Sequence, residues 1–291
     1  MPPAWRRRGR CFDDIIPPRH GEGERRSRWR GDETGDPLAS IPLHHPPDGP
    51  PPCAGEEYLI RHLPTTASTN DDLATLARDG APEGIWLRAD TQTGGRGRQG
   101  RLWVSPPGNL YASTIVRPRT GDPRAPSLAL VAAVALDTLL QGWLAPERLM
   151  IKWPNDLLAD GAKISGILLE GVGDAVVVGI GVNLAHHPDL PDRPATSLAA
   201  LGLSPPDPAD FAAELAASFA AWLARWRGEG LGVVLARWHA RAHPPGTALR
   251  VNAAEGAIDG LYEGLEADGA LRLKSADGRA HVVHAGDIFL L

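Results

Sequence analysis

The chain has 291 residues, of which 43% are hydrophobic, so it has room for two domains and can bury a substantial core. Its formal net charge of −5 argues against a nucleic-acid binder, since such proteins usually carry a basic excess. Its two cysteines cannot form a disulfide framework, which favours a reducing, cytoplasmic location. No apolar run approaches the roughly 18 residues of a membrane span, and the N-terminal arginines precede no apolar segment of a secretory signal.

Residues 1–54 differ in composition from everything after them. Prolines cluster at positions 17–18, 46–47 and 50–52, and arginine and glycine fill much of the rest. The segment lacks the apolar periodicity that offsets the entropy of folding, so we predict a disordered extension, or a start codon placed too far upstream. A winged-helix DNA-binding domain would need amphipathic helices in this segment, and no such pattern is visible in it.

The next part of the chain alternates strand and helix patterns. A short strand is predicted from residues 58–60. A helix should follow Ser68, because Ser68 can cap it, acidic residues occupy its first turn, and Gly80 can end it. The later elements expected before residue 145 are strands at 84–89 and 109–116 and a long, largely buried helix at 127–144.

A hairpin is predicted in the middle of the chain. Residues 149–153 and 156–158 are strand-like, and Asp160-Gly161 favours a tight turn, so residues 163–170 should fold back antiparallel. Residues 175–184 alternate apolar side chains with glycines, which predicts a strand that another group approaches closely. Helices are predicted at residues 211–226 and 231–242.

The pattern changes after the prolines at 244–245. Short strands separated by glycine and aspartate turns are predicted at 248–251, 257–265, 270–274, 280–284 and 288–291. Strands at this spacing are typical of a small β-barrel appended to an α+β body. We therefore predict an extension over residues 1–54, an α+β domain over 55–243 and a barrel domain over 244–291.

The heptapeptide GRGRQGR places three glycines and three arginines between two predicted strands. Glycine lets a backbone approach a ligand closely, and arginine matches phosphate and carboxylate oxygens with planar donors. A phosphate-binding P-loop is excluded because no Lys-Ser/Thr pair follows, and a dinucleotide site because LWVSPP cannot open the required helix. An RGG-type RNA-binding tail would be repeated and disordered. We interpret the segment as an anion-binding loop, with Gly95, Arg96, Gly97, Arg98 and Arg101 as its candidate contacts.

A second group of motifs lies further along the chain: KWPND at 152–156, KISGILLE at 163–170 and GIGVNL at 179–184. A single lysine at a strand end is usually solvated. Here Lys163 is accompanied by Gly166, Gly179 and Gly181, which leave space on the sheet face where side chains would otherwise pack.

The order of these motifs, together with Ser68-Thr69-Asn70 and Gln92, resembles that of the biotin–protein ligases over residues 57–291. The resemblance implies an α+β fold, with a class II synthetase-like mixed sheet and helices in the catalytic domain and an SH3-like barrel at the C-terminus. Residues 1–54 do not match the helix-turn-helix domain of the dual ligase–repressors, so the resemblance is to the monofunctional type.

The family resemblance implies a two-step reaction. Biotin and ATP form biotinyl-5′-AMP and pyrophosphate, and a lysine of a biotin carboxyl carrier protein then takes the biotin. The positions that match the family's biotin contacts are Ser68, Thr69, Asn70, Gln92, Arg96, Gly97, Arg98, Lys163 and Gly166. The positions expected at ATP and the adenylate are Gly95, Arg96, Arg98, Arg101, Trp103, Lys152, Asn155 and Asn183.

Three residues are predicted to take part in the chemistry: Lys163, Arg98 and Asp156. Lys163 would relieve the repulsion between a carboxylate and a phosphate, and Arg98 would add charge from the loop. Asp156 would either hold Mg²⁺ or help deprotonate the incoming lysine, and the sequence leaves both open. Trp103 would pack beneath the adenylate, order the loop or belong to the core, and Lys152 would meet phosphates or be structural.

Several alternatives remain at this point. A lipoate or octanoate ligase shares the architecture, a biotin-responsive repressor would need a DNA-reading domain, and an inactive homologue would be a scaffold. DNA and membrane binding are not expected, and a homodimer stays open. The spacing of His239 and His243 resembles a zinc pair on a helix, but a surface role is favoured because no glutamate lies between them.

Overall fold

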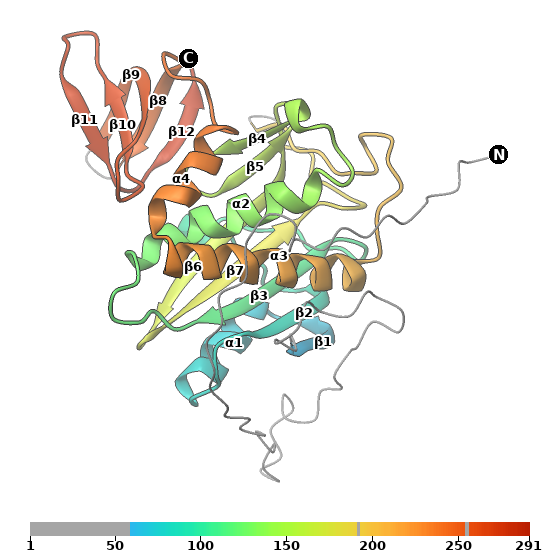
Figure 1. The fold of residues 1–291 in the computed structure, drawn as a ribbon. Helices are drawn as coiled ribbons and strands as arrows, with labels where there is room; N and C mark the ends of the chain where they lie inside the picture. The colour runs from blue at the N-terminus through green and yellow to red at the C-terminus, as the bar shows by residue number, and fades with distance from the viewer. Residues whose placement is uncertain (1–58, 191–192, 254–255) are drawn as a thin grey trace. The chain divides into compact units, whose positions relative to one another are not determined.

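The computed structural model describes residues 59–190, 193–253 and 256–291, and these belong to one compact unit. Its largest element is a mixed seven-stranded sheet with strand order β1-β2-β3-β7-β6-β5-β4 (Figure 1). The strands are β1 (Leu59–Thr66), β2 (Ile85–Gln92), β3 (Leu110–Val116), β4 (Leu149–Lys152), β5 (Asp156–Ala159), β6 (Ala162–Val172) and β7 (Ala175–Val182). The extension predicted over residues 1–54 lies outside the described residues.

Strands β1 and β2 are parallel, and helix α1 (Thr69–Arg78) connects them. A parallel pair needs such a crossover, whereas the remaining neighbours in this sheet are antiparallel. The helix begins as predicted, because the Ser68 side chain accepts a hydrogen bond from the Asp71 amide and two aspartates occupy the first turn. Gly80 follows its end with φ of 85°.

The predicted hairpin is confirmed between β5 and β6. Asp160 and Gly161 have φ values of 48° and 79°, the left-handed conformation that a tight two-residue turn needs. Strand β6 then pairs with β7 so that Gly166 lies opposite Gly181. The register therefore places two glycines next to each other on one face of the sheet.

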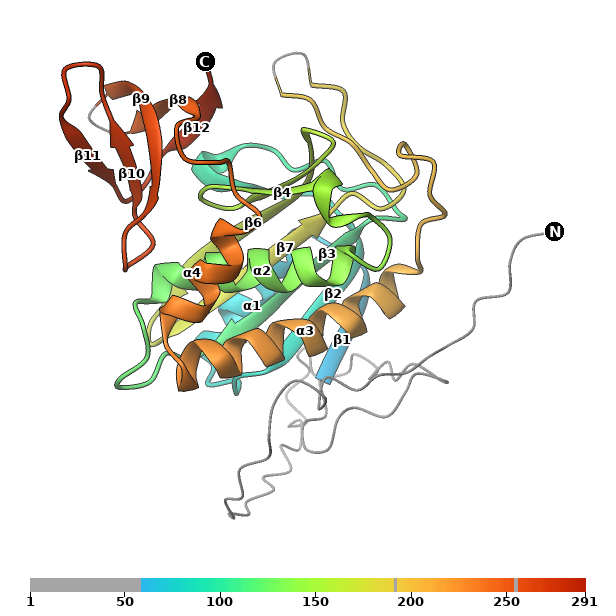
Figure 2. The same cartoon turned by 45° about the horizontal axis from the view of Figure 1, so that its top comes forward.

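Helices α2 (Leu128–Leu140), α3 (Pro208–Gly228) and α4 (Leu231–His239) lie on the other face (Figures 1 and 2). Side chains of β7 alternate accordingly: Val178, Ile180 and Val182 belong to the hydrophobic core beneath these helices. The intervening glycines face α1 and the arginine-rich loop, where they meet Asn70 and Trp103.

Two predicted helices end earlier than expected. Helix α2 stops at Leu140 instead of Leu144, because Gly142 leaves the helix and donates to the Leu139 carbonyl. Helix α4 stops at His239 instead of Ala242, and beyond its end the Arg241 carbonyl accepts from the Ile151 amide of β4 at 2.7 Å. His243 is therefore not on a helix with His239.

The C-terminal strands form a separate five-stranded antiparallel sheet with the order β11-β10-β9-β8-β12. They are β8 (Ala248–Ala253), β9 (Gly256–Leu265), β10 (Leu271–Lys274), β11 (Ala280–Val283) and β12 (Asp287–Leu290), which confirms the five predicted strands. Alternate residues such as Leu249 and Val251 are buried. Among the residues described, no helix is long and apolar enough to cross a membrane.

Candidate active site

A cavity of about 460 Å³ opens above the glycine-bearing face of the large sheet. With one exception, every candidate site residue predicted from the sequence lines it: Ser68, Thr69, Asn70, Gln92, Arg96, Gly97, Arg98, Arg101, Trp103, Lys152, Asn155, Asp156, Lys163, Gly166 and Asn183. The exception is Gly95, where an added Cβ would lie 2.7 Å from the Trp103 carbonyl oxygen. Gly95 therefore permits the loop to fold against itself.

One wall of the cavity is a chain of neutral polar groups at the start of α1. Gln92 Oε1 accepts from the Thr69 amide at 2.9 Å, and its Nε2 donates to Ser105 Oγ at 3.3 Å. Thr69 Oγ1 lies 2.8 Å from Ser113 Oγ, which in turn donates to Asn70 Oδ1 at 2.6 Å. Thr69, Asn70 and Ser113 are buried. Thr69 and Asn70 thus contact the cavity while partners behind them fix their orientation.

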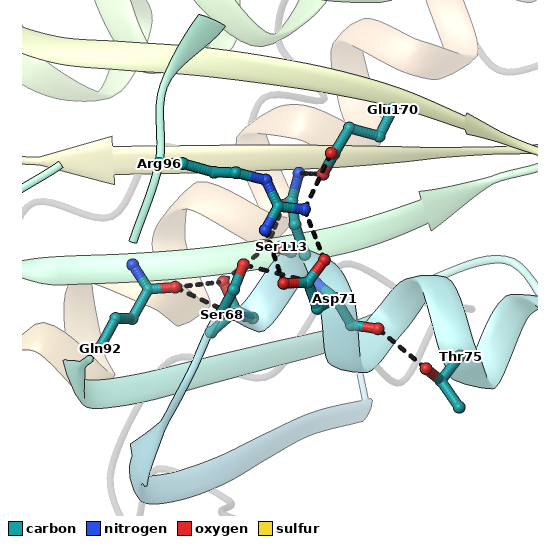
Figure 3. A network of polar contacts seen from close by, with 9 residues as sticks. Ser68, Asp71, Thr75, Gln92, Arg96, Ser113 and Glu170 are labelled. Atoms are coloured by element: carbon teal, nitrogen blue, oxygen red, sulfur yellow. Dashed lines mark hydrogen bonds and ion pairs between the residues drawn. The ribbon is translucent and has the colours of Figure 1, made fainter. Parts of the chain in front are cut away.

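The first loop arginine is held by two carboxylates (Figure 3). Arg96 forms a two-pronged contact with Asp71 of α1, and its Nη2 also donates to Glu170 Oε1 of β6 at 3.0 Å. Hydrogen bonds from Arg96 lower the pKa of Asp71, despite opposing burial. The hydrogen bond to Asp71, followed by the one to Glu170, raises the pKa of Arg96. This end of the loop is therefore tied to both α1 and the sheet.

The second half of the loop turns tightly. A short 3-10 turn spans Arg98–Gly100, with Gln99 at φ of 58°. Arg98 donates to Asn155 Oδ1 at 3.3 Å and to the Gly286 carbonyl at 3.1 Å. Arg101 pairs with Asp287. The loop is thus in contact with KWPND and with the start of β12.

Lys163 and Asp156 form an ion pair across the β5–β6 hairpin, with Nζ 2.6 Å from Oδ1. The Lys163 ammonium also lies 5.5 Å from the centre of the Trp103 ring. That ring rests on the glycine face, since a Cβ at Gly181 would come within 2.7 Å of it and one at Gly166 within 3.0 Å. The two glycines therefore leave the space in which the Trp103 ring packs against the sheet.

Two other predicted residues have different surroundings. Burial lowers the pKa of Lys152, and its ammonium lies 5.5 Å from the centre of the Phe289 ring. Asn183 is buried, and its Nδ2 donates to the backbone carbonyls of Thr196 at 3.0 Å and Lys163 at 3.5 Å. Its amide hydrogens are thus used to hold the segment after β7.

Comparison with known proteins identifies the family. Residues 64–184 match the model of the biotin/lipoate A/B protein ligase family, and residues 249–291 match the biotin protein ligase C-terminal domain. The chain is 38% identical over 244 residues to a biotin–[acetyl-CoA-carboxylase] ligase of Paracoccus denitrificans, covering 78% of this chain and 98% of that protein. This chain belongs to the biotin/lipoate protein ligase family.

Other family members give the same picture. A biotin–[acetyl-CoA-carboxylase] ligase of Mycobacterium tuberculosis is 36% identical, covering 77% of this chain and 85% of its own length. A bifunctional ligase/repressor of Bacillus subtilis is 33% identical, covering 80% and 74%. Among solved structures, the Aquifex aeolicus biotin protein ligase in complex with biotin and ATP superposes with a TM-score of 0.70 at 26% identity, covering 80% of this chain and 98% of that one.

The structure of this ligase-family member corrects the histidine prediction. His243 is 8% exposed and lines the cavity, so it is not the surface residue that its sequence context favoured. Burial, followed by the nearby positive charge of Lys152, lowers the pKa of His243. In the part of the chain that is described, no three His, Cys, Asp or Glu side chains are grouped to hold a metal.

The sequence analysis also missed residues behind the cavity wall. The polar contacts of the predicted residues are completed by Ser113, Glu170 and Asp71. None of these three was predicted to be a site residue. The one available indication was polarity: Ser113 is a hydroxyl residue within the fully buried strand β3, and Glu170 ends the KISGILLE motif.

Proposed function

We propose that the protein is an ATP-dependent biotin–protein ligase that forms biotinyl-5′-AMP and transfers biotin to a lysine of a biotin carboxyl carrier protein. The observation that carries the proposal is that one cavity combines a neutral polar wall with cationic side chains that include Lys163, Arg96 and Arg98. Biotin has the two complementary parts, since its ureido ring is neutral and polar and its tail ends in a carboxylate. The names of the relatives support the same activity.

The wall at α1 suits a cyclic urea. Gln92 keeps one amide hydrogen beyond the one it donates to Ser105, and Thr69 has hydroxyl lone pairs beside it. A urea offers a carbonyl acceptor flanked by N–H donors, so the two groups complement each other. The dithiolane ring of lipoate offers neither, which favours biotin over lipoate for this cavity.

Adenylate formation requires two anions to approach each other. The biotin carboxylate attacks the α-phosphorus of ATP, a P–O bond to it forms, and the bond to the departing pyrophosphate breaks. Lys163 would hold the carboxylate and the α-phosphate oxygens together. Asp156 now occupies its ammonium at 2.6 Å, so the substrate oxygens would replace or share that carboxylate.

The arginine-rich loop would retain the intermediate. A mixed anhydride hydrolyses if water reaches it, and closing a site excludes water. Arg98 already reaches Asn155 and the Gly286 carbonyl, so the loop lies across the cavity mouth. Trp103, seated on its glycines, anchors the end of the loop where the chain returns.

Mg²⁺ would accompany ATP and neutralise phosphate charge. Asp156, with Asn155 beside it, fits a cation that takes one or two protein oxygens and phosphate oxygens for the rest. In the second step, Asp156 is also placed to accept a proton from the acceptor lysine; the two roles remain alternatives for the same carboxylate.

The proposal extends to organisation and location. Residues 55–243 would form the catalytic domain and 244–291 the SH3-like domain, with a cytoplasmic location and a carrier protein as partner. We propose no DNA binding, since the net charge is −5 and residues 1–54 have no helix-turn-helix pattern.

The decisive test uses the full chain in two steps. ATP with biotin, ATP with lipoate and ATP alone are compared for pyrophosphate release, and a carrier domain is then added. Release that depends on biotin, followed by biotin on one carrier lysine, is expected. Release with lipoate and not with biotin would overturn the proposal in favour of a lipoate ligase.

A further inference from the structure

We propose that Glu170 is a positioning residue that sets the hydrogen-bond polarity of the cavity wall at Thr69. Its carboxylate would make that wall an acceptor, so that a bound ring must donate an N–H there. The inference rests on the proposed function, in which the donor belongs to the ureido ring of biotin. Glu170 does not line the cavity itself and would act through two intervening side chains.

The first step fixes the orientation of the Asn70 amide. An ionised carboxylate only accepts hydrogen bonds, and Glu170 Oε2 lies 2.6 Å from Asn70 Nδ2. The opposite orientation would bring two oxygens together at that distance. Asn70 Oδ1 must therefore point to Ser113, which donates to it at 2.6 Å. Asn70 is 4% exposed and packs over Gly179, so it has little freedom to move away.

The second step transmits this orientation to the cavity. Ser113 has a single hydroxyl hydrogen, and donating it to Asn70 leaves its oxygen free only to accept from Thr69, 2.8 Å away. The other neighbour of Thr69 Oγ1 is Gln92 Oε1 at 3.2 Å, which is also an acceptor. The Thr69 hydroxyl hydrogen thus points into the wall whichever partner takes it, and its lone pairs face the cavity.

The other half of the wall has the opposite polarity. The Thr69 backbone N–H must donate, so Gln92 turns its oxygen to it and keeps its NH₂ group for Ser105 and the cavity. The wall therefore presents an acceptor at Thr69 next to a donor at Gln92. The N–H of a urea can donate to Thr69 while its C=O accepts from Gln92. A ring that offers an acceptor opposite Thr69 would be mispaired.

Arg96 explains why a carboxylate is needed and not merely a polar side chain. Its guanidinium donates to Glu170 Oε1 at 3.0 Å, so the other oxygen, Oε2, accepts from Asn70. A glutamine at position 170 would give its oxygen to the guanidinium, which only donates, and its NH₂ group to Asn70. The Asn70 amide would then turn over, and Ser113 would accept from it and donate its own hydrogen to Thr69. That donation uses a Thr69 lone pair that otherwise faces the cavity, and the Thr69 hydrogen is left to Gln92 Oε1 or to the cavity.

The test measures KM for biotin and for ATP by pyrophosphate exchange in Glu170→Gln, Ser113→Ala and the double variant. Glu170→Gln is isosteric and Ser113→Ala removes one oxygen, so both variants should fold, with melting temperatures lowered by only a few degrees because one buried polar group loses its partner. Each single change should raise KM for biotin on the order of tenfold, the cost of one mispaired buried hydrogen bond, while KM for ATP stays within about twofold. The double variant should be no worse than about twofold beyond either single one, because both interrupt the same chain.

Asp71→Asn supplies the matched control, since the Asp71 carboxylate accepts from Arg96 as Glu170 does, whereas the Asn70 amide donates to Glu170. Its effect should multiply with that of Ser113→Ala. If Glu170→Gln also multiplies with Ser113→Ala, or raises KM for ATP as much as for biotin, Glu170 acts only by anchoring Arg96 and the inference is wrong. A wild-type protein that neither binds nor turns over biotin would instead overturn the proposed function, and the inference with it.

Discussion

Replacing Gly181 by alanine tests whether the seat of Trp103 positions the arginine-rich loop. The new Cβ would meet the indole at 2.7 Å, whereas ordinary contact begins near 3.4 Å, so the ring must move by about 0.7 Å. Trp103 cannot move alone, because its backbone N–H donates to the Gly95 carbonyl at 2.9 Å and the adjacent Leu102 pairs with Arg96. The displacement would therefore pass to the loop arginines.

We expect Gly181→Ala to lower kcat/KM for biotin-dependent pyrophosphate release by about 10- to 100-fold, since misplacement near 1 Å can cost on the order of 100-fold. Overpacking should also destabilise the fold by roughly 1–3 kcal/mol, which a urea titration measures. Gly171→Ala in β6 is the matched control, because nothing lies within 4 Å of its Cβ position. Equal activity of the two variants would refute the idea that the glycine face exists to seat Trp103.

Three further predictions follow from the charged groups. Lys163→Ala should lower adenylate formation by on the order of 100-fold or more with little change in melting temperature, and wild-type pyrophosphate release would refute its assignment. Arg98→Gly should let biotinyl-AMP escape, measured as biotin on bystander lysines; strict carrier specificity would contradict the retention role. Glu83 accepts hydrogen bonds from Arg227. Burial alone would raise the pKa of Glu83, but these hydrogen bonds outweigh burial and lower the pKa from 4.5. Glu83 therefore stabilises the fold above its unfolded pKa, and this contribution is lost as pH falls through its folded pKa. Glu83→Gln should remove that part of the acid sensitivity in melting curves between pH 3 and 7, and unchanged sensitivity would refute the assignment.

Local patterns predicted most of the secondary structure because their determinants are local. Ser68 caps α1 with its own side chain, and Asp160-Gly161 forms its turn from two residues. The ends of α2 and α4 were predicted too far along, since apolar periodicity continues beyond Leu140 and His239, where the backbone leaves the helix.

The motifs also located the cavity, yet they could not specify its internal pairing. Asn70 and Glu170 lie 100 positions apart in the sequence, and their contact depends on the register of β6 and β7. Gly181 predicted a close approach without saying that Trp103 makes it. Lys163 was expected to face phosphates, and its pairing with Asp156 emerges only when the hairpin closes.

The coupling of biotin to ATP cleavage by the full chain is the most direct test of the proposed activity. We predict that pyrophosphate appears only when biotin is present, that lipoate does not replace it, and that a carrier domain added afterwards receives biotin on one lysine. Pyrophosphate released equally with lipoate, or biotin-dependent release with no transfer to any carrier, would contradict it.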